Sequence, residues 1–154
     1  MTGRLEAAIL VQLSSCHEWG SLKGHRVNVY SAITRWVPLS LWIAFIFVMS
    51  SIPDLPGEYR ELPPHSDKVV HFVEYLILAL LLYRGMSGDG SKRVGRDLTA
   101  LLLIGFGIAG LDEIYQSIVP GRDSSAADLA SDLGGIMTGM AIIAFRARRS
   151  LSKG

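Results

Sequence analysis

The chain has 154 residues, enough for one domain, and 49% of them are hydrophobic while only 19% are charged. Its mean hydropathy of +0.33 favours a membrane protein. A formal net charge of +1 gives no support to nucleic-acid binding, and the single cysteine, Cys16, excludes an intrachain disulfide and a cysteine-based metal cluster.

The N-terminal segment, residues 1–33, contains little structural information. A short apolar run covers residues 7–13, and residues 13–16 loosely resemble a lipoprotein cleavage box. Lipidation at Cys16 is disfavoured because Glu6 lies inside the would-be signal and several apolar runs follow. We interpret residues 1–33 as a cytoplasmic extension that is poorly ordered or lies on the membrane surface, with a misassigned start codon as the alternative.

Four apolar runs predict four membrane-spanning helices. They extend from Trp36 to Ser51, from Asp67 to about Arg84, from Leu98 to Val119 and from Ala126 to Phe145. Ser66 has the properties of an N-cap for the second helix, and residues 125–128 have the form of a capping box at the start of the fourth. The predicted fold is all-α: a four-helix transmembrane bundle at residues 34–146, followed by a basic cytoplasmic tail at residues 147–154.

Basic residues predict the orientation of the bundle. They are concentrated in the N-terminal segment, the second connection and the C-terminal segment, whereas the first connection is acidic apart from Arg60 and the third contains only Arg122. Short cytoplasmic flanks carry the excess of lysine and arginine in membrane proteins. Both termini are therefore predicted to be cytoplasmic.

Ionisable residues within three helices fall at one predicted depth. At about 1.5 Å per residue, His71 and Glu74 lie roughly 8–12 Å below the outer end of the second helix. By the same rise, Asp112 and Asp132 lie roughly 10 Å below the outer ends of the third and fourth. Since a carboxylate near the middle of a span costs roughly 2.5–3.5 kcal/mol on insertion scales, this repetition predicts a polar site inside the bundle.

Within each helix, these polar residues share one face at about 100° per residue. The faces comprise Asp67, His71, Glu74 and Tyr75 on the second helix, Asp112 and Gln116 on the third, and Asp128, Asp132, Gly135 and Gly139 on the fourth. Glu113 is turned about 100° away from Asp112 and receives no role. The three faces are predicted to meet on one axis, with Arg122 on the turn above them.

Structural explanations compete with functional ones at several of these positions. Asp67 and Asp128 are also expected as first-turn acids, Gly135 and Gly139 as a close-packing face, and Tyr75 as an interfacial aromatic residue. The deeper residues are too far from the helix ends to be caps. We predict a functional site for this deeper set, which is His71, Glu74, Asp112, Gln116 and Asp132.

The same residues resemble those of a known family. Residues 66–75, SDKVVHFVEY, resemble the D-K-x-x-H-F-x-x-Y segment of VanZ-like membrane proteins. Residues 112–116, DEIYQ, followed by the Pro-Gly-Arg turn at 120–122, Asp128 and Gly135, are similar to the second and third blocks of that family. The resemblance extends from about Trp36 to Phe145, and Asp132 departs from it because many members have asparagine at this position.

The resemblance implies a multi-pass protein of the bacterial cytoplasmic (inner) membrane. The founding member of the family is linked to teicoplanin resistance, so an effect on glycopeptide susceptibility is implied, but no reaction is. The expected partner is a membrane lipid or a lipid-linked envelope precursor, and self-association through the Gly135/Gly139 face is a further expectation.

Three functions remain open from the residues, beside a purely structural role of the protein in the membrane. The first is a binding module, in which Arg122 and Lys68 contact a phosphate while the acids bind amines or hydroxyls. The second is an intramembrane enzyme, in which His71, Glu74, Asp112 and Asp132 form a divalent metal site or an acid–base pair. The third is proton- or ion-coupled transport.

We expect binding rather than catalysis, and no cofactor unless a divalent cation is bound. A single histidine among carboxylates suits manganese- or magnesium-like ions better than zinc. The acidic residues of the predicted site cannot all stay ionised at low dielectric. Either some of them keep their protons, or a cation is held among them. The predicted ligand-binding residues are Asp67, Lys68, His71, Tyr75, Asp112, Gln116, Arg122, Asp128 and Asp132.

Overall fold

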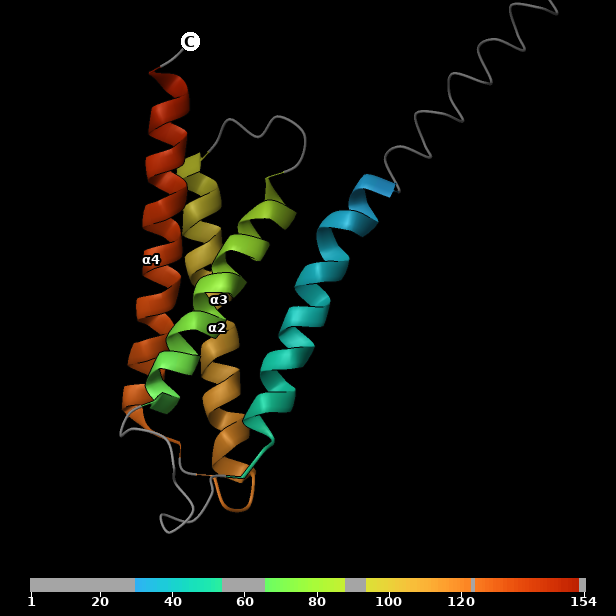
Figure 1. The fold of residues 1–154 in the computed structure, drawn as a ribbon, viewed down its shortest axis with the longest axis vertical. Helices are drawn as coiled ribbons and strands as arrows, with labels where there is room; N and C mark the ends of the chain where they lie inside the picture. Colours follow the sequence, from blue (N-terminus) through green and yellow to red (C-terminus); the bar gives the residue numbers. More distant parts are fainter. Residues whose placement is uncertain (1–29, 54–65, 88–93, 123, 153–154) are drawn as a thin grey trace, which may run out of the picture. The chain divides into compact units, whose positions relative to one another are not determined.

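A computed structural model describes residues 30–53, 66–87, 94–122 and 124–152, and these residues form four α-helices. The first helix is Tyr30–Ser50. It is followed by α2, Ser66–Met86, α3, Val94–Ile118, and α4, Ala126–Leu151 (Figure 1). Each helix is long and apolar enough to cross a membrane. The predicted all-α fold with four candidate spans is confirmed, whereas the cytoplasmic location of the termini stays a prediction.

The chain divides into two compact units, residues 1–36 and residues 37–154. The described part of the first unit is the opening of the first helix. There, the Arg35 Nε donates to the Ser31 carbonyl at 2.9 Å, and the Thr34 hydroxyl donates to the Tyr30 carbonyl at 3.1 Å. The helix therefore starts at Tyr30 rather than at the predicted Trp36, inside the segment assigned to the extension. The rest of that extension, residues 1–29, lies outside the described residues.

The last helix is longer than its apolar run. Ser125 caps its start, because the Asp128 N–H donates to the Ser125 hydroxyl oxygen at 3.3 Å. The helix continues past the predicted end at Phe145 to Leu151, where Arg148 and Arg149 lie in its last turn. Arginine is a good helix former and its charge is favourable at a helix C-terminus. Part of the predicted tail at residues 147–154 is therefore helical.

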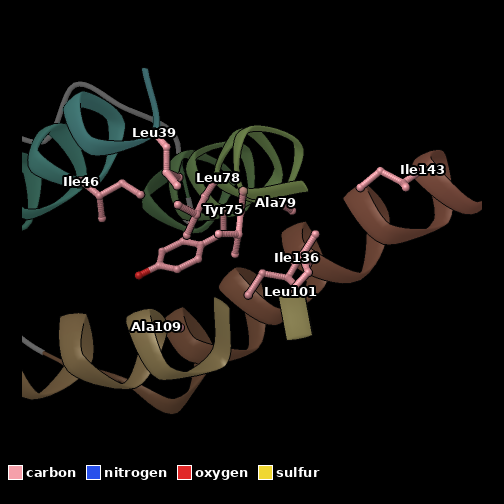
Figure 2. Packing of buried hydrophobic residues seen from close by; sticks show 10 residues of the cluster. Leu39, Ile46, Tyr75, Leu78, Ala79, Leu101, Ala109, Ile136 and Ile143 are labelled. Carbon is pink, nitrogen blue, oxygen red and sulfur yellow. The ribbon is translucent and has the colours of Figure 1, made fainter. Parts of the chain in front are cut away.

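Within residues 37–154, α2, α3 and α4 pack side by side around an apolar core, and α2 and α4 share the most extensive contact (Figure 1). Figure 2 shows the buried side chains meeting between the helices. The core consists of Leu39, Ile46, Tyr75, Leu78, Ala79, Leu82, Leu101, Ala109, Ile136 and Ile143.

Two glycines allow the backbones of α2 and α4 to touch. A Cβ at Gly135 would lie 2.3 Å from the Phe72 carbonyl oxygen and 2.8 Å from the Leu76 nitrogen. A Cβ at Gly139 would lie 2.7 Å from the Ala79 Cβ. Such small-residue faces bring membrane helices together. In the structure, α2 of the same chain covers the face that contains Gly135 and Gly139. Self-association of the protein stays a prediction, and it would have to use another surface.

Polarity is distributed in the way expected for a membrane protein. Large apolar side chains such as Leu41, Leu103 and Ile118 are 67%, 67% and 72% exposed. Several polar side chains are buried instead, and most of them lie towards the end of the bundle where the first helix and α3 end and α2 and α4 begin. In a bilayer the exposed apolar surface faces lipid, while polar groups are protected between helices. The candidate site is therefore sought among the buried polar side chains at this end of the bundle.

Candidate functional site

The centre of the polar cluster joins α2 to α4. His71 on α2 and Asp132 on α4 are 4% and 1% exposed, and the His71 Nδ1 lies 3.0 Å from the Asp132 Oδ1. Asp132 lies one helical turn before Gly135, and His71 directly precedes Phe72. The close backbone contact between Gly135 and Phe72 therefore sets the distance between the two polar side chains.

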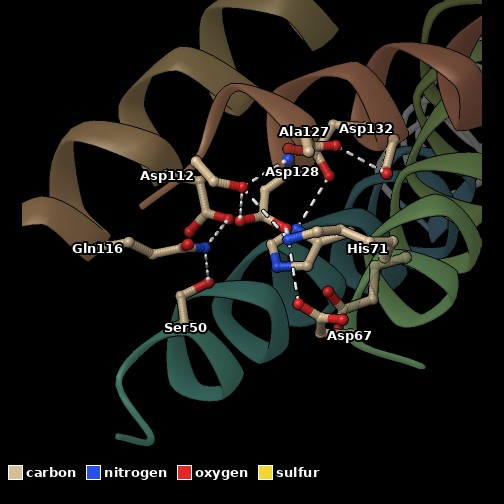
Figure 3. A network of polar contacts seen from close by, with 12 residues as sticks. Ser50, Asp67, His71, Asp112, Gln116, Ala127, Asp128 and Asp132 are labelled. Atoms are coloured by element: carbon tan, nitrogen blue, oxygen red, sulfur yellow. Dashed lines mark hydrogen bonds and ion pairs between the residues drawn. The ribbon is translucent and has the colours of Figure 1, made fainter. Parts of the chain in front are cut away.

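The third helix contributes a fully buried carboxylate. Asp112 on α3 is 0% exposed, and the Gln116 Nε2 donates to its Oδ2 at 3.0 Å. The same Nε2 lies 3.2 Å from the Ser50 hydroxyl of the first helix. Figure 3 shows Asp112, His71 and Asp132 facing a common space from three helices. One potential ligand atom from each of these three residues lies within 4.8 Å of those of the other two.

A second group of charges lies at the start of α2 and α4. The Lys68 Nζ contacts the Asp128 Oδ1, lies 3.0 Å from the Asp67 Oδ2, and donates to the Ser125 hydroxyl at 3.2 Å. The Ser125 hydroxyl in turn donates to the Asp128 Oδ2 at 2.7 Å. Asp128 is therefore both a first-turn acid of α4 and the main partner of Lys68.

Arg122 lies at the rim of a half-open pocket of about 160 Å³. Its lining residues are Met49, Ser50, Asp67, Val70, His71, Glu74 and Arg122. The Arg122 Nη1 donates to the Ile52 carbonyl at 3.2 Å, which connects the α3–α4 turn to the end of the first helix. The turn contains Gly121 at φ 80°, a left-handed conformation that glycine adopts readily. His71 belongs to both the pocket wall and the buried cluster beneath it.

Several buried oxygens have no hydrogen-bond partner within the described part of the chain. They are the Glu74 Oε1, the Asp112 Oδ1, the Gln116 Oε1, the Glu113 Oε2 and the Tyr75 hydroxyl, together with the Ser87 hydroxyl just beyond the far end of α2. Glu74 is anchored through its backbone, since its carbonyl accepts from the Trp42 Nε1 at 3.0 Å. Buried acceptors are normally satisfied, so such a concentration indicates a place where another group belongs.

The predicted convergence of three helices is present in the structure. His71, Asp112 and Asp132 come together, with Gln116 and Glu74 beside them, and Asp67, Lys68 and Asp128 form the neighbouring charged group. The ring of Tyr75 packs in the apolar core, while its buried hydroxyl interacts with Asp112. The ligand-binding role of these residues stays a prediction.

Two residues that contact the site were not predicted from the sequence. Ser50 is 2% exposed and contacts Gln116, and Trp42 binds the Glu74 carbonyl. A serine and a tryptophan in an apolar run are common in membrane helices and give no signal of their own. One available sign for Ser50 was its location at the same end of the bundle as the acids.

The geometry permits two kinds of chemistry. A histidine oriented by a carboxylate, as His71 is by Asp132, is suited to proton transfer or to metal binding. A guanidinium at a pocket rim, as at Arg122, is suited to anion binding.

Comparison with known proteins identifies the family. The profile described as VanZ/LLP1 matches residues 7–147. The match begins well before Trp36, so it includes most of the segment that the sequence analysis set apart as an extension. Neither a curated protein nor a solved structure matches the chain. Together with the four candidate spans, the profile match shows that this chain is a multi-pass membrane protein of the VanZ/LLP1 family.

Proposed function

We propose that this protein binds the phosphate-bearing head group of a membrane lipid or a lipid-linked envelope precursor in the pocket beside Arg122. The observation that carries the proposal is a half-open pocket of about 160 Å³ at one end of a membrane-spanning bundle, with residues of both charge signs in its wall. Arg122 and His71 supply donors, whereas Asp67 and Glu74 supply acceptors. A head group that contains both a phosphate and an amine or hydroxyl complements such a wall.

Arg122 is the residue to which we assign the phosphate. Its guanidinium offers five N–H donors in a planar fork that matches phosphate oxygens. Lys68 is the other predicted phosphate ligand, but its Nζ is engaged by Asp67, Asp128 and Ser125. Lys68 therefore supports the site by holding the start of α2 against that of α4.

The sequence supports a particular membrane and a particular side of it for the proposed pocket. Basic flanks favour cytoplasmic termini, which would place the Arg122 end of the bundle outside the cytoplasm. The resemblance to VanZ-like proteins favours the bacterial cytoplasmic membrane and a link to teicoplanin-type susceptibility. A pocket on the outer side would encounter wall precursors where glycopeptides act.

Binding of short-chain lipids to the purified full chain in detergent tests the proposal. Dioctanoyl phosphatidylethanolamine should bind, and dioctanoylglycerol, which lacks the phosphate, should not. Arg122→Ala should weaken the binding of the phospholipid by about 1.5–3 kcal/mol, because a charge-assisted contact is lost. This corresponds to an affinity loss of about 10- to 150-fold, measurable by titration calorimetry.

Arg148→Ala is the matched control, because Arg148 is an exposed arginine near the opposite end of α4. The affinity of the Arg148→Ala variant for dioctanoyl phosphatidylethanolamine should equal that of the wild type. Equal binding of dioctanoylglycerol, or equal losses in the two arginine variants, would contradict the proposal.

A further inference from the structure

We propose that His71, Asp112 and Asp132 bind a divalent cation of the Mn²⁺ type beneath the pocket. The proposal does not depend on head-group binding, since none of the contacts used here involves Arg122. All three residues are at least 96% buried, and each offers one ligand atom within 4.8 Å of the others. They come from α2, α3 and α4, so their convergence results from the fold and not from neighbouring positions in one helix.

The distances suit one shared ion. Two ligands on opposite sides of an ion with bonds of about 2.1 Å lie about 4.2 Å apart, and two adjacent ligands lie about 3.0 Å apart. The 3.0 Å between the His71 Nδ1 and the Asp132 Oδ1 therefore equals the spacing of adjacent ligands. A separation at the 4.8 Å limit would exceed the spacing of opposite ligands by about 0.6 Å.

A second, independent observation points to a cation. The Asp112 Oδ1 is buried and makes no hydrogen bond with the described residues, although its partner oxygen, Oδ2, accepts from Gln116. Gln116 thus holds one oxygen of the Asp112 carboxylate and leaves the other oxygen available to a ligand. Residues that hydrogen-bond to metal ligands orient them in the same way. The Glu74 Oε1 and the Gln116 Oε1 are likewise buried without a partner in this part of the structure.

Charge balance supports the same conclusion. The cluster has two carboxylates and Glu74 close to a single imidazole, all of them nearly fully buried. Of the neighbouring cations, Lys68 is occupied by Asp67 and Asp128, and the charge of Arg122 at the pocket acts on Glu74 and Asp112 but leaves Asp132 to His71. A dication would neutralise Asp112 and Asp132 and remove the cost of keeping two carboxylates in a low-dielectric interior.

The ligand set selects the type of ion. Carboxylate oxygens suit Mg²⁺, Ca²⁺ and Mn²⁺, and an imidazole suits transition metals, so one histidine with two aspartates favours Mn²⁺. Zn²⁺ prefers more nitrogen or sulfur ligands in a closed site, and Mg²⁺ is seldom held by imidazole.

Titration of the purified full chain with Mn²⁺, followed by the loss of the free-ion electron paramagnetic resonance signal, tests the proposal. The wild type should bind one Mn²⁺ per chain, and Mg²⁺ at equal concentration should not displace it. Asp112→Asn should weaken binding by at least about 100-fold, since loss of an outer-shell group alone costs about 10–100-fold. Gln116→Met, which removes only the group that positions Asp112, should fall in that smaller range.

Asp97→Asn is the control, because Asp97 is a buried acid at the other end of α3 and should leave Mn²⁺ binding unchanged. A thermal melt of the wild type with and without Mn²⁺ gives a test that needs no variant, because a ligand that binds only the folded state raises the melting temperature. Absence of both binding and thermal stabilisation at about 1 mM free Mn²⁺ would overturn the site. Equal Mn²⁺ binding by the wild type and Asp112→Asn would overturn it too, and displacement by equimolar Mg²⁺ would overturn the choice of ion.

Discussion

The two halves of the α2–α4 contact are held together in different ways. Near the start of α4, Asp128 and Asp132 face Lys68 and His71, so the contact is polar and includes buried charge. Beyond Gly135 the contact is between backbones and apolar side chains. Packing stabilises membrane helices without a desolvation penalty, whereas buried charged pairs are weak sources of stability. The apolar half therefore supplies most of the packing that holds α2 and α4 together, and the polar half is the part to which we assign ligand binding.

Gly135→Ala should give the largest effect, because the new Cβ would lie 2.3 Å from the Phe72 carbonyl oxygen and the helices would have to separate. We expect a loss of about 3 kcal/mol or more in the free energy of unfolding, at the upper end of overpacking effects. Unfolding of the purified protein in mixed micelles measures it.

Gly107→Ala provides the control for that variant. A Cβ at Gly107 meets no described atom within 4 Å, and alanine is the better helix former. This variant should be as stable as the wild type or more stable by up to about 1 kcal/mol. Similar losses in both variants would mean that the close contact does not hold the helices.

Leu78→Ala and Asp132→Asn compare one buried residue from each half directly. Leu78 is fully buried in the apolar core, and truncating it should cost about 2–4 kcal/mol in unfolding free energy. Asp132→Asn keeps the side-chain shape and removes a buried carboxylate, so its cost should stay below about 1 kcal/mol, because His71 can remain neutral. The same unfolding assay applies. If Asp132→Asn were as destabilising as Leu78→Ala, the polar half would be structural.

Ser125→Ala should have a smaller effect than Gly135→Ala or Leu78→Ala. It removes the N-cap of α4 and the hydroxyl shared by Lys68 and Asp128, and caps contribute about 1 kcal/mol. Ser124→Ala, at an exposed neighbouring position, should leave the unfolding free energy unchanged. A cost at Ser125 no greater than that at Ser124 would show that the first turn of α4 does not depend on its cap.

The sequence predicted the four helices because a long apolar run has few alternatives to a spanning helix. It also predicted which faces meet, since the spacing of Asp132 and Gly135 places both on the face that packs against α2. Helix ends were less predictable because polar residues such as Arg148 are compatible with both a helix and a tail. The partners of Lys68 were not predictable from spacing, since they depend on how closely α2 and α4 approach.

Among the described residues, the end of the first helix is tied to α3 and to the α3–α4 turn, and this bears on how the proposed ligand would enter. The Ser51 and Tyr115 hydroxyls lie 2.9 Å apart, and Arg122 holds the Ile52 carbonyl, so the first helix is tied to α3 and to the turn that follows it. The pocket wall instead comes largely from the first helix and α2, where Val70 is 46% exposed to the surroundings. A lipid bound as proposed would therefore approach the pocket from the side facing the bilayer, and its acyl chains would stay in the hydrocarbon.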